Sequence, residues 1–172
     1  MKKILFLLIA AGVLWTSCEK EEISGTATQS VAGEWIVTFD GVKADGSMAY
    51  EDPFGMGHTH ILTYNTAKNV PTEMWVDDNL NTWEFKVVVN LNYDAATFST
   101  NDYVDNHAYE SQVKITDGKV LFGAAKTPGG MPADSIVFHV WFDDDPYVAA
   151  GYWDHFKVSG YRYTGFVDDE AH

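Results

Sequence analysis

The chain has 172 residues and a formal charge of −14, because 25 Asp and Glu outnumber 11 Lys and Arg. An acidic excess of this size, without a basic patch, excludes a nucleic-acid partner, since phosphate would be repelled. The chain holds a single cysteine, so no internal disulfide can form and stability must come from packing.

The first segment of the chain has the pattern of a secretory signal. Two lysines precede an apolar run from Ile4 to Trp15, which is too short for a stable membrane span. The only cysteine, Cys18, stands where such a signal is cut, and the mainly acidic run Glu19-Lys20-Glu21-Glu22 follows it. A lone cysteine in an exported protein needs another use, and lipid attachment is the obvious one.

This segment resembles a bacterial lipoprotein signal, and the acidic run resembles the surface-export signal of lipoproteins in the Bacteroidetes. The resemblance implies that residues 1–17 are removed and that an acylated Cys18 anchors the protein in the cell outer membrane, with the acidic run favouring surface exposure. Acylation would then supply the membrane affinity. The alternative is an ordinary signal peptide with an incidental cysteine. Residues 18–31 are predicted to be the acylated cysteine and a flexible tether, and residues 32–172 the folded domain.

From residue 33 onward, apolar and polar residues alternate with a period of two, which predicts β-strands and no amphipathic helix. The clearest run extends from Trp83 to Leu91. Apolar alternation on both sides of Asp117-Gly118 predicts a hairpin with a tight turn there. Further strands are expected at 35–39, 136–142 and from 156 to about 166, and weaker ones at 58–65, 73–77 and 96–100.

Eight or nine short antiparallel strands follow from this pattern, joined by turns rich in Gly, Pro, Asn and Asp. Such a sequence is typical of a barrel or a sandwich. The fold class is therefore all-β, and the residues described next favour the barrel.

Gly33-Glu34-Trp35 opens the first strand and Arg162 stands on the last one. A Gly-x-Trp at this place resembles the signature of the lipocalins and the wider calycin group. The resemblance implies a lipocalin-like antiparallel barrel of about eight strands, closed at one end by Gly33, Trp35 and Arg162. A guanidinium stacked on an indole is a favourable contact, more so when water is excluded.

The mature chain also resembles a family of small Bacteroidetes lipoproteins described as lipid-binding putative hydrolases, through residues 32–35, 154–162 and 164–166. This resemblance implies a lipid or small hydrophobic ligand. One departure is that lipocalins carry a helix after the barrel, whereas only six residues follow Phe166 here.

Catalytic machinery is not visible in the sequence. A hydrolase needs an activated nucleophile, a base and an oxyanion site, and no Gly-x-Ser-x-Gly elbow occurs. We therefore assign no catalytic residue and no cofactor. His58 and His60 would face the same side of a strand, but no motif fixes a third metal ligand, so we predict no metal site.

Aromatic side chains are the other candidate chemistry, since they make up 15% of the chain. They could line the mouth of a ligand cavity, stack on sugar rings, or simply fill the barrel. Candidate ligand-binding residues are His58, His60, Trp83, Phe85, Phe138, Tyr152 and Trp153. The expected function is non-catalytic binding of a small hydrophobic molecule or lipid inside the barrel. The alternatives are a surface glycan-binding or assembly module and, third, a hydrolase.

Overall fold

A computed structural model describes residues 25–169, so the predicted signal 1–17 and Cys18 lie outside the described residues. The described part consists of strands with two short helical turns, α2 (Pro146–Ala149) and η1 (Val167–Asp169). The strands are β1 (Gly33–Val42), β2 (Met48–Tyr50), β3 (Thr59–Asn65), β4 (Glu73–Asp77), β5 (Lys86–Asn92), β6 (Thr97–Ser99), β7 (Val104–Asp105), β8 (Gln112–Lys126), β9 (Pro132–Phe142) and β10 (His155–Arg162).

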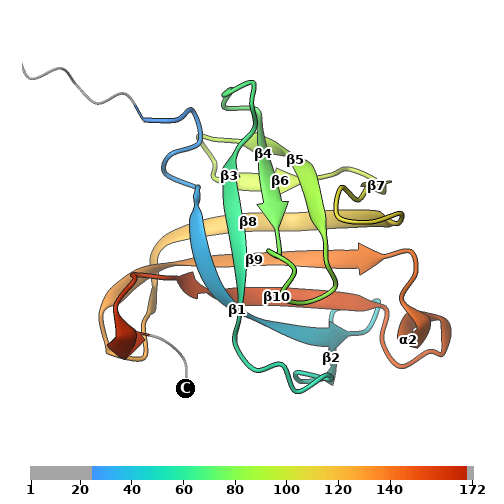
Figure 1. Ribbon diagram of the computed structural model, residues 1–172. Coiled ribbons are helices and arrows are strands. Elements are labelled where there is room, and N and C mark those ends of the chain that lie inside the picture. The colour runs from blue at the N-terminus through green and yellow to red at the C-terminus, as the bar shows by residue number, and fades with distance from the viewer. Residues whose placement is uncertain (1–24, 170–172) are drawn as a thin grey trace, which may run out of the picture.

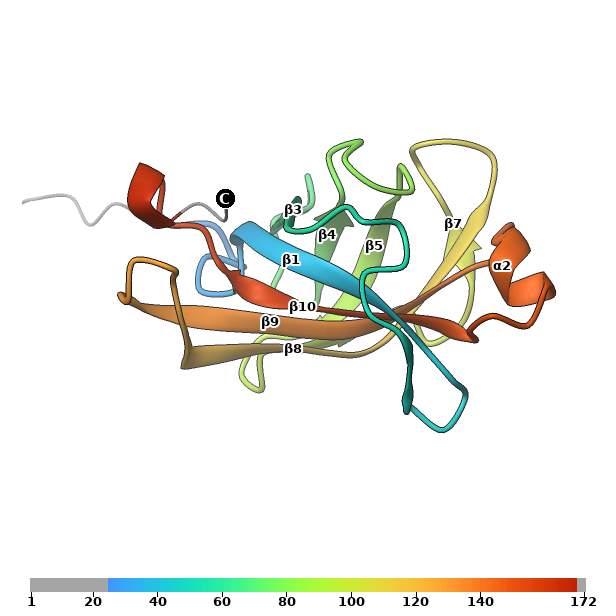
Figure 2. The same ribbon diagram turned by 90° about the horizontal axis from the view of Figure 1, so that it is seen from below.

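Eight of these strands form a closed antiparallel barrel (Figures 1 and 2). The hydrogen-bonded order is β10-β9-β8-β6-β5-β4-β3-β1, and β1 then pairs with β10 along its length, from Trp35 opposite Arg162 to Val42 opposite His155. The short strands β2 and β7 lie outside this ring, on β1 and β8. The prediction of an all-β antiparallel barrel of about eight strands is confirmed.

The predicted hairpin at Asp117-Gly118 is wrong. Residues 112–126 form the single strand β8, whose register with β9 shifts between Thr116 and Lys119, so that Asp-Gly makes a β-bulge. Asp117 has a φ of +54°, a left-handed conformation that tight turns and some bulges share. A Cβ at Gly118 would lie 2.4 Å from the Phe98 ring, so glycine lets β6 cross closely.

Two predicted strand limits also differ from the structure. The strand expected to begin at Trp83 begins at Lys86, because Glu84 has a φ of +54° and breaks the extended run. The last strand ends at Arg162 rather than near Phe166, and the Phe166 side chain is exposed.

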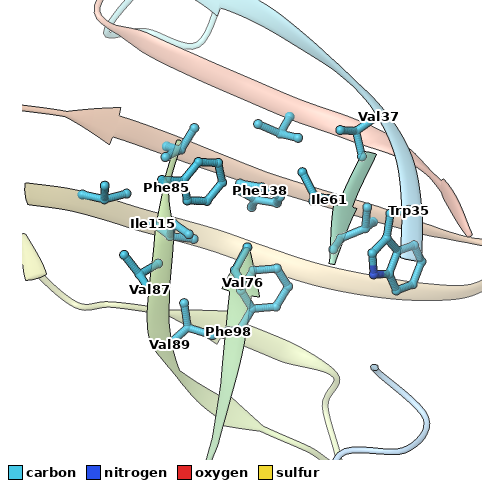
Figure 3. Close-up of a cluster of buried hydrophobic side chains, with 14 of the residues drawn as sticks. Trp35, Val37, Ile61, Val76, Phe85, Val87, Val89, Phe98, Ile115 and Phe138 are labelled. Atoms are coloured by element: carbon cyan, nitrogen blue, oxygen red, sulfur yellow. The ribbon is translucent and has the colours of Figure 1, made fainter. Parts of the chain in front are cut away.

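The inward faces of the barrel strands are mostly apolar, as the period of two requires, although β3 also places Thr59 and Thr63 on this face. Figure 3 shows side chains from opposite walls pointing toward one another, with Phe85, Phe98 and Phe138 among them. The Phe98 and Phe138 rings lie 5.8 Å apart. All of these residues belong to one buried cluster. The interior is therefore filled by side chains in this structure.

The strand directions define two ends of the barrel. We call the end that carries residues 25–32, 66–72, 93–96, 127–131 and 163–169 the closed end. We call the other the loop end, and it carries residues 43–58, 78–85, 100–111 and 143–154. Within residues 25–169, no helix has the length and hydropathy that a membrane crossing requires.

The predicted flexible tether needs correction over residues 25–31. These residues form hydrogen-bonded turns at the closed end, with Gln29 N donating to Thr26 O and Val31 N donating to Thr28 O. Thr28 and Val31 are fully buried. Their polar composition suggested a linker, but the buried Val31 side chain and hydrogen bonds to the backbone of the segment dock it: Thr63 Oγ1 donates to Val31 O at 2.7 Å and Arg162 Nη2 donates to Ser30 O at 2.8 Å.

Candidate functional site

The loop end of the barrel is covered by aromatic rings from three separate connections. Phe54 follows β2, Trp83 precedes β5, and Tyr147 and Trp153 lie between β9 and β10. Phe54 is central, with its ring centroid 5.5 Å from Trp83, 5.3 Å from Tyr147 and 5.7 Å from Trp153. It also contacts Phe156 of the barrel core at 6.0 Å. We call Phe54, Trp83, Tyr147 and Trp153 the aromatic plug.

Some rings of the aromatic plug are exposed to solvent and others are buried. Phe54 and Trp83 are partly buried against the core, whereas Tyr147 is exposed. Tyr152 is exposed beside it, 6.0 Å from Tyr147 and 6.2 Å from Trp153. The site thus presents aromatic faces to solvent on one side and continues into the apolar interior on the other.

A buried carboxylate, that of Asp145, fixes the plug on the β9–β10 connection. It accepts hydrogen bonds from Tyr147 N at 2.8 Å and from Trp153 Nε1 at 2.9 Å. The same carboxylate caps the N-terminus of α2. In the sequence this residue looks like part of a solvated acidic turn, and only the return of the chain to Trp153 reveals its role.

A second buried carboxylate, Asp78, fixes the connection that carries Trp83. It accepts hydrogen bonds from the backbone N–H groups of Leu80, Thr82 and Glu84 at 2.8–3.1 Å. Its side chain is fully buried. Buried carboxylates that are bonded in this way hold a loop in one conformation.

The opposite end is closed by Trp35, and the structure brings Arg162 onto it. The guanidinium carbon lies 4.3 Å from the indole centroid, and Trp35 Nε1 donates to Thr63 Oγ1 at 2.8 Å. Arg162 also pairs with Asp134 at 3.0 Å. A Cβ at Gly33 would lie 2.2 Å from the guanidinium, which explains the glycine of the Gly-x-Trp motif.

The predicted ligand residues fall into three places. Phe85 and Phe138 lie in the filled interior, and Trp83, Tyr152 and Trp153 lie at the loop end. His60 lies on the outward face of β3, where its Nδ1 is 2.7 Å from Glu34 Oε1. The His58 ring lies 6.5 Å from the ring of Tyr161, whose buried cluster stands apart from the main core. The two histidines therefore do not face the interior, and ligand binding by the other five stays a prediction.

Among residues 25–169, no three His, Cys, Asp or Glu side chains are placed to hold a metal ion together. His107, a third histidine of the loop end, packs edge-on against Trp75 at 4.9 Å.

One polar chain on the outer wall was missed by the sequence analysis. Asp154 Oδ2 lies 2.8 Å from His155 Nδ1, and His155 Nε2 lies 2.7 Å from His139 Nδ1. Trp141 stacks on the nearly buried His155 ring at 4.0 Å and donates its Nε1–H to Asp154 at 3.1 Å. The period of two places both histidines on the outward face, but only the β9–β10 register joins them.

The order of donors in this chain follows from the chemistry of imidazole. A neutral ring has one N–H, so when His155 donates from Nδ1 to Asp154 it accepts at Nε2 from His139 Nδ1. Burial and the neighbouring His155 lower the pKa of His139. Hydrogen bonds from His155 and Trp141 lower the pKa of Asp154.

The hydrogen-bonded chain of Asp154, His155 and His139 can bind a proton, but it is not the catalytic triad of a hydrolase. An imidazole occupies the place of the nucleophilic hydroxyl. In the described part of the chain, no serine or threonine hydroxyl hydrogen-bonds to either ring. The geometry supports structural and protonation roles.

The lowered pKa of His139 predicts an acid-sensitive fold. Near the ordinary His value of 6.5, the unfolded chain binds more protons than the folded one, so the free energy of unfolding decreases as pH falls below that value. His139→Asn keeps an N–H donor near Nδ1 but cannot titrate. We expect its loss of stability between about pH 7.5 and about pH 5.5 to be smaller than that of the unmodified chain.

Urea unfolding at several pH values, followed by circular dichroism, measures this difference. His58→Asn is the control, because His58 is exposed. If the free energy of unfolding depends on pH equally in the unmodified chain and in His139→Asn, titration of His139 is not the cause of the acid sensitivity.

The fold and the site together define a closed β-barrel protein with one end sealed by a Trp–Arg stack and the other covered by aromatic loops. The chain matches the family described as lipid-binding putative hydrolases over residues 20–167, and it belongs to that family. No curated protein matches the chain.

Proposed function

We propose that this protein binds one lipid or other small hydrophobic molecule through the loop end of its barrel and carries out no reaction on it. The observation that carries the proposal is the aromatic plug, a set of rings, some of them exposed, that lies directly on a mostly apolar core. Membership of a lipid-binding family supports it. Ligand sites of this kind are mostly apolar, with a few polar groups near the entrance.

Because side chains fill the interior, an apolar tail must replace some of them. Phe54 is the best candidate to move, since glycines at 55 and 57 with φ of +61° and +63° follow it in the same connection. Its ring touches the other plug residues and Phe156, so a tail that entered its place would meet the same apolar surfaces. In this proposal Phe54 acts as a stopper.

Phe54→Ala tests the stopper directly. Removing the ring removes the free energy needed to displace it, and the apparent affinity for a hydrophobic ligand rises when the open form is more populated. We expect N-phenyl-1-naphthylamine, a neutral fluorescent probe, to bind at one site and to bind the variant several-fold more tightly. Fluorescence titration of the domain measures both values, and fatty acids should displace the probe.

Phe166→Ala is the matched control, because Phe166 is exposed at the closed end. Its affinity for the probe should equal that of the unmodified domain. The proposal fails if neither the unmodified domain nor Phe54→Ala binds the probe with saturation. It also fails in its non-catalytic part if ester substrates turn over and substitution of His155 abolishes that turnover.

We further propose that an acylated Cys18 anchors the protein in the cell outer membrane. The lipoprotein-like pattern of residues 1–22 supports this. The segment that leads into β1 lies at the closed end, where Ala27 N donates to Asn69 Oδ1 at 2.8 Å, so a tether from Cys18 would leave the loop end free to receive a ligand. Cys18→Ser should abolish labelling by an alkyne fatty acid and leave the protein out of the membrane fraction. Unchanged labelling would contradict the anchor.

A further inference from the structure

A hollow of about 410 Å³ lies on the outer wall of the barrel, over β4 and β5. This volume is within the roughly 300–1,000 Å³ range of small-molecule sites. The hollow is separate from the aromatic plug, because its wall residues point away from the interior. Its lining includes Thr66, Lys68, Glu73, Trp75, Val88 and His107, and we call it the Trp75 hollow.

The floor of the hollow is apolar although it faces outward. Trp75 and Val88 are register partners across β4 and β5, and both are half-buried. Their strand neighbours Met74 and Val87 fill the interior instead. Burial in the barrel core therefore does not account for a tryptophan at position 75.

The indole of Trp75 is held in place by its neighbours. The His107 ring meets it edge-on, with centroids 4.9 Å apart and planes at 90°. The Lys86 ammonium lies 5.2 Å from the indole centroid and is paired with Asp77 at 3.2 Å. A flat ring that is fixed before binding loses little conformational freedom when a ligand stacks on it.

A donor and an acceptor stand together at the rim of the hollow. Lys68 Nζ lies 2.8 Å from Glu73 Oε2, and Thr66 Oγ1 donates to Glu73 Oε1 at 2.6 Å. The hydrogen bonds from Lys68 and Thr66 lower the pKa of Glu73, so its carboxylate is ionised at neutral pH. The Lys68 side chain is 72% exposed, so its ammonium is already accessible to a ligand.

We propose that the Trp75 hollow binds a neutral sugar residue. The C–H face of a sugar ring would stack on the indole, whose π face carries negative charge density. One hydroxyl of the sugar would donate to Glu73 and its neighbour would accept from Lys68, a pattern that a purely apolar ligand cannot use. A neutral sugar fits better than an acidic one, because the chain carries a charge of −14.

Affinity electrophoresis tests the proposal with the whole folded domain. Native gels are cast with a neutral soluble polysaccharide, namely amylopectin, yeast mannan, arabinoxylan or galactan, and with polygalacturonate as the acidic comparison. We expect at least one neutral polymer to retard the domain and polygalacturonate not to do so. Trp75→Ala should abolish the retardation, Trp75→Phe should keep part of it, and Glu73→Gln should weaken it.

Trp141→Ala is the control, because Trp141 also faces outward but has the His155 ring stacked on its face, with centroids 4.0 Å apart and planes at 22°. It should run as the unmodified domain does. Titration with N-phenyl-1-naphthylamine reports on the barrel site separately, and its affinity should be the same in Trp75→Ala. The sugar proposal is overturned if no neutral polymer retards the domain, if Trp75→Ala is retarded equally, or if Trp75→Ala loses the hydrophobic probe instead.

Discussion

Trp35→Ala is expected to lower the free energy of unfolding by about 3–5 kcal/mol, the range for truncating a large buried aromatic side chain. Trp35 is fully buried. The substitution leaves a cavity at the closed end and removes the hydrogen bond from Nε1 to Thr63, which itself donates to Val31 O at 2.7 Å. The docked segment 25–32 would lose its support. Urea unfolding followed by circular dichroism measures the change.

Arg162→Ala should cost less, and the two losses should not add. The guanidinium covers the Trp35 ring, so each side chain loses part of its contribution when the other is removed. The double variant should therefore be more stable than the sum of the single losses implies. Additive losses in this double-mutant cycle would show that the stack does not couple the first and last strands.

Gly160→Ala is expected to have an effect at or beyond the upper end of the roughly 1–3 kcal/mol that overpacking costs. A Cβ at this position would lie 1.9 Å from Ile36 O and 2.7 Å from Val37 Cα. Both contacts are with backbone, which cannot rotate away. Gly160 pairs with Val37 where β10 meets β1, so the methyl group would push apart the two strands that close the barrel.

Ser159→Ala is the neighbouring control, because the alternation along β10 points residue 159 away from the core. It should change the unfolding midpoint little. If Gly160→Ala unfolds at the same urea concentration as the unmodified domain, the close approach of β10 and β1 is not required.

The fold could be predicted because the period of two recurs in each of the long strands between residues 33 and 162. A filled barrel needs mainly apolar side chains on the inward face of each strand. Runs such as 136–142 show the alternation that places them there. The pairing of Trp35 with Arg162 joins the two ends of the domain, so a motif at each end was informative. The resemblance to lipocalins in particular stays a prediction.

The hairpin at Asp117-Gly118 could not be excluded from sequence. Asp-Gly indicates a positive φ but does not say whether the chain reverses or continues through a bulge. That choice depends on β6, which supplies Phe98 to the crossing from a distant part of the chain. The Asp-Gly pair correctly indicated a positive φ at Asp117, but the chain reversal predicted from it was wrong.

The site was harder to predict than the fold because its parts lie on separate connections. Phe54 has no sequence pattern that links it to Trp83 or Trp153, and only closure of the barrel brings the three rings together. Asp78 and Asp145 look like ordinary turn residues, although both are buried and orient the loops. His139 and His155 meet through strand register alone.

Native mass spectrometry of the protein from its own host tests the proposed function most directly. The Cys18→Ser form should be used, so that a covalent lipid is not counted. Occupancy of the barrel by one hydrophobic ligand predicts a second species, heavier by the mass of one lipid, that loses this mass on gentle activation. The Phe54→Ala form should retain more of that species. A single species at the mass of the bare chain, in both forms, would contradict lipid binding by this barrel.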